Sequence, residues 1–262
     1  MGGGLILKDE KEKEEAEKDE RVEKYIRPYL NARELIHGGI RWVLWLKNST
    51  REDRQAPFIR KRFEEVRSAR EGTSNEDRAP WLFESERQPE EDYLAIPSVF
   101  SEKRKYFLAE HESSNVVASN LLFTVEDPEG LAFSVIESSM FMAWQDLVGG
   151  RLEMRKRFSN TLVWNTFPLP KLTKEQKDRI IEGGRKVLES RALIRQKDLT
   201  ASLADMYSEP AVLDPDLEKN LLKAHEALDK AVDSAFSDKP LKSEEERQRA
   251  LLEMYKKMTN EK

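Results

Sequence analysis

Cysteine is absent from the 262 residues of this sequence. The chain therefore forms no disulfide, has no thiolate nucleophile and builds no cysteine-ligated zinc or iron–sulfur site. Histidine is almost as scarce, since only His37, His111 and His225 are present, and they lie too far apart along the chain to indicate a metal site. The sequence predicts neither thiol chemistry nor a metal ligand set.

Long apolar runs are absent as well. No segment approaches the roughly 18 consecutive apolar residues that span a membrane, and the N-terminus enters a charged series instead of a signal-peptide core. We therefore expect a cytoplasmic protein with no membrane partner. The 38% of apolar residues is enough for real cores, in one large domain or two ordinary ones.

An excess of positive charge is also missing, because the formal net charge is −5. Proteins that bind nucleic acid on their own normally carry a basic excess or at least a basic face. A DNA partner would therefore need local basic groups, or another part of a larger protein that supplies most of the phosphate contacts.

The glycine-rich loops of nucleotide sites are missing too. A methyl-donor or dinucleotide site needs such a turn directly after a strand, whereas Gly2–Gly4 precedes any expected strand and Gly149–Gly150 follows an expected helix. Asn165–Pro168 lacks the paired prolines of the tetrad in amino-methylating DNA enzymes, and the triplet Asp9–Lys11, which has the spacing of a nuclease metal site, lies in a charged run. No catalytic residue and no cofactor site are predicted in this chain.

What is present divides the chain into three regions. Residues 1–24 are rich in charge with almost no apolar face, which predicts an exposed helix or a tether. Residues 25–170 contain short apolar and aromatic runs separated by turn residues, which predicts a β-rich part. Residues 171–262 show helical spacing throughout, starting with a capping box at Thr173 and Gln176. The expected fold class is α+β.

Within the middle region, the apolar runs are short enough to be strands. They include Tyr93–Ile96, Tyr106–Leu108 and Leu131–Ile136. Two helices are expected among them, one over residues 50–69 with Pro57 near its start and one at Ser138–Val148 that the following glycines end.

The most informative segment is the run from Arg151 to Arg157. In an extended backbone Arg151, Glu153, Arg155 and Arg157 would all point to the same face. An arginine fork can bond guanine O6 and N7 together, and a glutamate can accept from the cytosine amino group. Such a face would read bases; the alternative interpretation is a solvated strand whose charges neutralise one another.

The order of several aromatic-rich motifs resembles the target recognition domain and C-terminal helical domain of the MmeI-like, single-chain restriction-modification enzymes. The resemblance runs from about Tyr25 to Phe236. It is carried by Tyr29–Leu46, Ile96-Pro97, Ser138–Trp144, Gly150–Asn160, Trp164–Pro170, Ser202–Tyr207 and Ala224–Asp233.

This resemblance implies what the remainder of the protein contains. In such enzymes a nuclease domain, a helical spacer and an S-adenosylmethionine-dependent adenine methyltransferase precede the region matched here. The implied partners are double-stranded DNA and the methyltransferase domain of the same parent chain. S-adenosylmethionine, and Mg²⁺ where a nuclease is linked, would belong to the parent enzyme, so this part alone is expected not to be catalytic.

The resemblance also assigns residues. Glu153, Arg155 and Arg157 match the family's Glu-x-Arg-x-Arg strand, which faces base edges in the major groove. Asn120 matches a second base-reading position. Ser98 follows Ile96-Pro97 at a third, where relatives often carry a longer polar residue.

The resulting expectation is a β-rich DNA target recognition domain with embedded helices at 25–170, followed by an all-α C-terminal domain at 171–262. It would select bases for an N6-adenine DNA methyltransferase, with the target adenine flipped into the catalytic domain. Two alternatives stay open at this point: a protein-interaction scaffold of charged helices, and an intact hydrolase without recognisable motifs.

Overall fold

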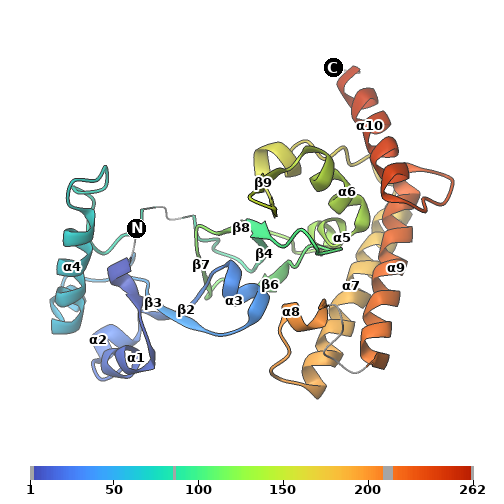
Figure 1. Ribbon diagram of the computed structural model, residues 1–262. Helices are drawn as coiled ribbons and strands as arrows, with labels where there is room; N and C mark the ends of the chain where they lie inside the picture. Colours follow the sequence, from blue (N-terminus) through green and yellow to red (C-terminus); the bar gives the residue numbers. More distant parts are fainter. Residues whose placement is uncertain (1–2, 85–86, 209–214, 261–262) are drawn as a thin grey trace.

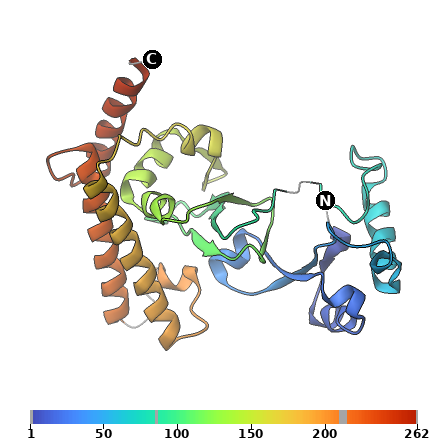
Figure 2. The ribbon, with the colours of Figure 1, turned by 180° about the vertical axis from the view of Figure 1, so that it is seen from behind.

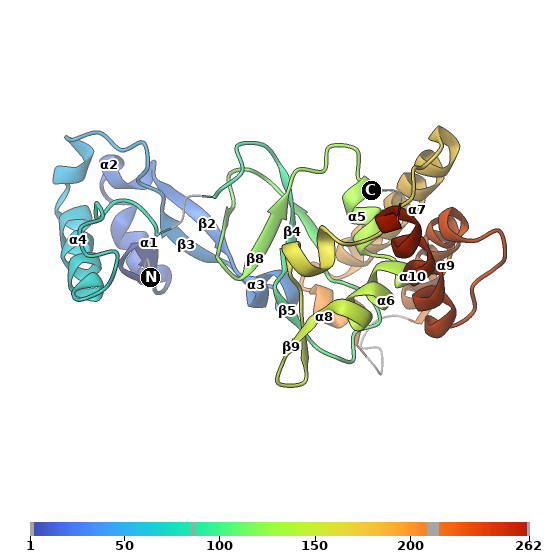
Figure 3. The same cartoon turned by 90° about the horizontal axis from the view of Figure 1, so that it is seen from above.

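The chain is an α+β protein, as the sequence predicts (Figure 1). A computed structural model describes residues 3–84, 87–208 and 215–260. Short strands form three small sheets before residue 158, and long helices dominate the C-terminal part. The helix α4 (Pro57–Arg70) lies at one end of an elongated molecule and α9 (Pro215–Phe236) lies toward the other (Figures 1 and 3).

The N-terminal lobe is built on a sheet with the strand order β1-β3-β2-β7. β1 and β2 pair antiparallel with β3, and β7 pairs parallel with β2. These strands are β1 (Ile6–Leu7), β2 (Ile26–Leu30), β3 (Arg41–Leu44) and β7 (Val117–Ala118). The sheet shares one apolar core with α4, which contributes Ile59, Phe63 and Val66. The β2–β3 ribbon continues from this lobe into the centre of the molecule (Figures 1 and 2).

The charged segment near the N-terminus is helical but packed. It forms α1 (Glu10–Ala16) and α2 (Glu20–Glu23), and each begins at an aspartate, Asp9 or Asp19, whose side chain accepts a backbone N–H of the first turn. Ala16 and Val22 are fully buried in the lobe core. Two apolar residues are too few for helical periodicity to indicate a packed face, which is why the sequence predicts only an exposed helix or tether.

Helix α4 confirms the helix expected over residues 50–69. Pro57 occupies its first turn, where the missing N–H has no intrahelical partner in any case. The chain start packs closely against it, because a Cβ on Gly4 would lie 2.8 Å from Cγ2 of Val66. Gly4 therefore permits an approach that a larger residue would prevent.

The centre of the molecule contains the other two sheets. In one, β4 (Tyr93–Pro97) lies between β6 (Glu110–Glu112) and β8 (Leu122–Val125); in the other, β10 (Arg155–Arg157) lies between β5 (Val99–Phe100) and β9 (Gly150–Leu152). All of these pairings are antiparallel. Three helices accompany them: α3 (Ala32–His37), α5 (Leu131–Ile136) and α6 (Ser139–Val148).

Two of the apolar runs are not strands. Leu131–Ile136 is the helix α5, because Asp127 accepts the backbone N–H groups of Ala132 and Phe133 at 2.9 and 2.8 Å and so favours a helical first turn. Tyr106–Leu108 is a buried connection without strand pairing. Short apolar runs fit a buried strand and a buried helix equally well. The helix expected at Ser138–Val148 is confirmed as α6, with Ser138 accepting from the N–H of Phe141.

The C-terminal part is helical, as predicted. It consists of α7 (Lys174–Lys197), α8 (Leu203–Met206), α9 and α10 (Glu244–Asn260), and the capping box of Thr173 and Gln176 opens α7. Gly183 allows α7 to approach α9, since a Cβ there would lie 3.0 Å from the Cα of Leu228. Among the described residues, no helix is both long and apolar enough to span a membrane.

A buried polar cluster joins the helices to the centre. Arg191 of α7 is fully buried and donates to Glu137 at 2.7 Å, to the carbonyl of Ala109 at 2.7 Å and to the hydroxyl of Tyr207 at 2.9 Å. His225 lies 2.7 Å from that hydroxyl through Nε2. Burial and the Arg191 charge lower the pKa of His225, whose ring stacks on Tyr106 and lies 3.2 Å from the carbonyl of Glu137 through Nδ1.

Candidate nucleic-acid interface

The segment from Arg151 to Arg157 forms a hairpin, not one continuous strand. β9 and β10 pair with Arg155 opposite Leu152 and Arg157 opposite Gly150. The chain reverses through Glu153 and Met154, where Glu153 has φ 58°, the one positive φ at a non-glycine residue in the described chain. This left-handed backbone lets the chain turn within two residues.

The hairpin separates residues that the sequence places on one face. Cross-strand partners share a face of the hairpin. Arg151 therefore lies on the same face as its partner Lys156, and Arg155 and Arg157 lie on the opposite face. Lys156 is buried, with Nζ 2.7 Å from Oδ2 of Asp146, and Arg151 extends toward the same carboxylate. The prediction of a single face with all four side chains is therefore wrong for Arg151, because the turn resets the alternation.

Glu153 and Arg155 remain together at the exposed tip. Nη2 of Arg155 lies 3.0 Å from Oε2 of Glu153, and their side chains are 50% and 78% exposed for Arg155 and Glu153 respectively. Solvent screens a pair of this kind, so it holds the two groups only weakly. Both can exchange this contact for one with a ligand. Figure 3 shows the hairpin projecting from the central part of the molecule.

Backbone hydrogen bonds bring Ser98 and the turn of Asn120 next to the hairpin. The N–H of Phe158, just after β10, donates to the carbonyl of Ser98 at 2.9 Å. The N–H of Ser98 donates to the carbonyl of Leu121 at 3.0 Å, which places the exposed Asn120 beside it in the chain. The hydroxyl of Ser119 accepts from the N–H of Leu121 and stabilises that turn.

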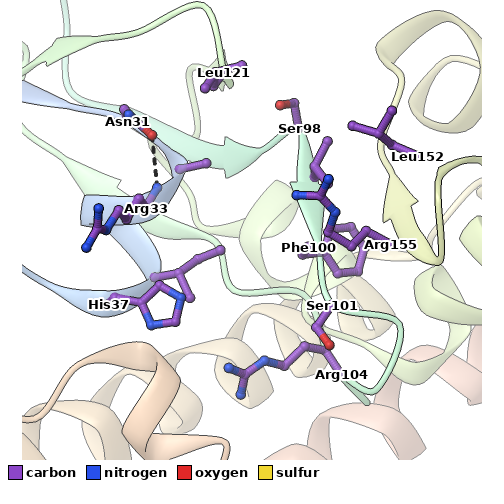
Figure 4. A pocket seen from close by; sticks show the side chains of 13 residues that line it. Asn31, Arg33, His37, Ser98, Phe100, Ser101, Arg104, Leu121, Leu152 and Arg155 are labelled. Carbon is purple, nitrogen blue, oxygen red and sulfur yellow. Dashed lines mark hydrogen bonds between the residues drawn. The ribbon is translucent and has the colours of Figure 1, made fainter.

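A hollow of about 650 Å³ lies between the hairpin and α3 (Figure 4). Ser98 and Arg155 line it, whereas Glu153, Asn120 and Arg157 do not. The structure thus places two of the five predicted residues in the hollow and the other three at or near the same hairpin. Its remaining lining residues are Asn31, Ala32, Arg33, Ile36, His37, Val99, Phe100, Ser101, Arg104, Leu121 and Leu152.

Three further nitrogen-bearing side chains of this hollow, those of Arg33, His37 and Arg104, were not predicted. Arg33 and His37 stand four residues apart on α3 and so share a helix face. Asn31 caps this helix by accepting from the N–H of Arg33 at 2.9 Å. Arg104 donates to the carbonyl of Tyr207 at 2.7 Å, and burial lowers its pKa. Only the four-residue spacing of Arg33 and His37 is visible in the sequence.

The hollow is suited to an anion. Arg33, Arg104 and Arg155 are cationic, and none of the described residues that line it is a carboxylate. A concave surface with one sign of charge concentrates the field and attracts the opposite charge. No group of three or more His, Asp or Glu side chains in the described ranges could hold a metal ion. The arrangement supports binding through hydrogen bonds and charge.

Comparison with known proteins gives consistent matches over the whole chain. Residues 1–171 match the family model described as "MmeI, target recognition domain", and residues 172–261 match "MmeI, C-terminal domain". The first match includes the N-terminal segment 1–24. The predicted boundaries at residues 24 and 170 stay predictions.

Two relatives extend this result. The chain is similar to DNA methyltransferase A of Bacillus subtilis (strain 168), with 31% identity over 264 residues that cover 98% of this chain and 29% of the relative. It is also similar to a solved structure of the type IIL restriction-modification enzyme MmeI in complex with DNA, with a TM-score of 0.88 and 34% identity. That match covers 98% of this chain and 34% of the enzyme. The chain thus spans about a third of the length of these relatives.

Proposed function

Because this chain belongs to the family of the MmeI target recognition and C-terminal domains, we propose that it reads the base sequence of double-stranded DNA for a methyltransferase. The similar solved structure is of an enzyme in complex with DNA, and the similar curated protein is a DNA methyltransferase. Each of these proteins is about three times as long as the part matched here. The methyltransferase domain would therefore be a further part of the same polypeptide, and the proposal implies a cytoplasmic location.

The observation that carries this proposal is the exposed β9–β10 hairpin with its Glu153–Arg155 pair. A two-stranded ribbon fits the major groove of B-DNA, and the groove edges present the donors and acceptors that these side chains complement. Arg155 can donate two hydrogen bonds to a guanine, and Glu153 can accept from the paired cytosine. Arg157 shares the face of Arg155 and can contact a further base.

Ser98 and Asn120 would supply further base contacts beside the hairpin. Neither side chain has a hydrogen-bond partner in the described part of the chain. The Asn120 amide can pair with adenine, while the short Ser98 hydroxyl can reach only a base that approaches closely. Arg33 and His37, on the opposite side of the hollow, would contact the sugar–phosphate backbone and so fix the register.

Catalysis would lie outside this chain. A methyl-donor site on a doubly wound sheet needs a glycine-rich turn directly after a strand, and we found no such turn in this sequence, so we place the S-adenosylmethionine site outside this chain. That cofactor, and Mg²⁺ where a nuclease is linked, would belong to the parent enzyme. This chain would hold the duplex in register while the adenine is flipped into the catalytic domain.

Selection from a pool of random duplexes tests the proposal. The chain is incubated with the pool at low salt, and the retained duplexes are sequenced. We expect one DNA word to be enriched. Retention of duplexes without any sequence preference, or of no duplex at all, would contradict the proposal.

A further inference from the structure

Four arginines surround a second hollow, on the N-terminal lobe and away from the hairpin. This hollow has a volume of about 450 Å³ and lies along α4 and the turns before it. Its lining residues are Arg51, Arg54, Gln55, Arg60, Phe63, Glu64, Arg67 and Trp81. Glu64 is the one acidic residue among these described residues.

The backbone holds the arginines around this hollow. Arg60 and Arg67 stand seven residues apart on α4, which puts them on one helix face two turns apart. Trp81 packs against Phe63 with ring centroids 6.0 Å apart, and the guanidinium of Arg54 lies 4.1 Å from the centre of the Trp81 ring. Arg54 is thereby oriented by a half-buried aromatic ring instead of by a carboxylate.

The arginines of this hollow differ from the other arginines of α4. Arg62 pairs with Glu12 and Glu65, and the buried Arg70 donates to the backbone carbonyls of Arg78, Ala79 and Leu82. Arg51, Arg60 and Arg67 are exposed and form no ion pair or hydrogen bond through their side chains with any described residue. Four cations beside one carboxylate, in a chain of net charge −5, make a local surface with an excess of positive charge.

We infer that this hollow binds the sugar–phosphate backbone of double-stranded DNA, outside the bases that the hairpin reads. Guanidinium groups bind phosphate oxygens through parallel hydrogen bonds. The two helical turns between Arg60 and Arg67 rise by roughly 10 Å, while one DNA strand carries a phosphate about every 3.4 Å along its axis. The two arginines therefore reach different phosphates of one strand.

The position of the lobe supports a contact that flanks the recognised word. α4 lies at the end of the molecule farthest from α9, and the β9–β10 hairpin lies between them (Figure 1). The β2–β3 ribbon connects the lobe to the centre. A phosphate contact here contributes affinity without base information, and it supplies the local basic surface that a DNA-binding chain of net charge −5 needs. This inference rests on the proposed function.

The test measures DNA affinity against salt concentration for three variants of the full chain. R60A/R67A removes two cations from the hollow. R179A/K186A is the matched control, because these residues have the same spacing on α7 but each pairs with a glutamate one turn earlier. R60K/R67K keeps the charge and checks that the fold tolerates substitution. The probes are a duplex with the selected word and a duplex of unrelated sequence.

We expect R60A/R67A to weaken binding to both duplexes by the same factor, on the order of tenfold at low salt. The slope of log affinity against log salt should become shallower by about 1.8, since each phosphate contact contributes about 0.9. The preference for the selected word should be unchanged. R179A/K186A and R60K/R67K should bind with slopes close to that of the unmodified chain.

Two results would overturn the inference, and they are distinguishable. If the unmodified chain selects its word and R60A/R67A behaves like R179A/K186A, the hollow does not contact DNA, and an acidic protein surface becomes its partner. If the unmodified chain binds no duplex with any preference, the proposed function fails, and this inference fails with it.

Discussion

Exchanging the charges of Glu153 and Arg155 should reverse one base pair of the recognised word. In the double variant E153K/R155D a donor stands at the turn and an acceptor at the start of β10. Both side chains are at least half exposed and contact each other, so the exchange keeps a possible ion pair and disturbs no core residue. The left-handed backbone at position 153 is unaffected by the exchange, because lysine and glutamate tolerate φ 58° equally.

The size of the effect follows from hydrogen bonding at base edges. An arginine on guanine and a glutamate on the paired cytosine discriminate by roughly 1 to 3 kcal/mol, or about 5- to 150-fold. With donor and acceptor exchanged, the wrong orientation of the pair places like groups against one another. A C·G pair at one position of the word should therefore become G·C at the same position, while the other positions stay unchanged.

The assay is the duplex selection described above, followed by methylation mapping in the parent enzyme carrying the same substitutions. R151A is the control, because Arg151 lies on the opposite face of the hairpin and should leave the word unchanged. An unchanged word in E153K/R155D, with binding retained, would refute base reading by this pair. The hairpin would then be a solvated, self-neutralised surface.

Four further results are expected. The chain alone should transfer no tritiated methyl group from S-adenosylmethionine to DNA; any transfer above background would contradict a purely reading role. DNA binding by the chain should be weak and salt-sensitive, as its net charge is −5, and tight binding in about 0.5 M salt would contradict this account. Burial and the neighbouring Glu110 raise the pKa of Glu112 to about 7, so the ionised carboxylate destabilises the fold as the pH rises from about 4.5 to 7. The free energy of unfolding of E112Q, measured in urea, should exceed that of the wild type by on the order of 1 kcal/mol at pH 8 and should equal it near pH 4. G184A should lower the free energy of unfolding by about 1 to 3 kcal/mol, because its Cβ would lie 2.1 Å from Oγ of Ser134. The Cβ of G150A would have no atom within 4 Å, so this control should unfold at the wild-type urea concentration.

Local signals in the sequence predicted most of the helices. The capping serine before α6, the capping box at Thr173 and the proline at the start of α4 each act within one turn, so a reader of the sequence can see the whole cause. The helix α5 was missed because its start depends on the side chain of Asp127, which lies before a proline and a glycine that also indicate a turn. Local rules fail where two local signals compete.

The candidate site was only partly predictable for a different reason. Arg155 and Arg157 were found from a two-residue period, but the reversal at Glu153 requires a positive φ that sequence rules expect at glycine or asparagine. Arg33 and Arg104 reach the hollow from segments far from the hairpin in the chain. No pattern within one segment can indicate such neighbours, because they meet only in the folded chain, where for example Ser98 pairs through its backbone with Phe158 and Leu121.

The contacts of α6 connect the hairpin of the first matched domain to the helices of the second. The hairpin is held on α6 by Lys156, which bonds Asp146, and by Gln145, which donates to the carbonyl of Arg157 at 3.2 Å. α6 in turn is held by the C-terminal helices, since the Trp144 ring packs against the ring of Tyr255 on α10 with centroids 5.6 Å apart.

The first turn of α6 is fixed from the same side. Asp229 of α9 accepts from the backbone N–H and the hydroxyl of Ser139, each at 2.7 Å. A base reader must hold its side chains in a fixed geometry to discriminate by hydrogen bonds of about 3 Å. If the hairpin reads bases as proposed, the C-terminal helices act on recognition without lining the hollow beside the hairpin. They fix α6, and α6 fixes β10, the strand that carries Arg155 and Arg157.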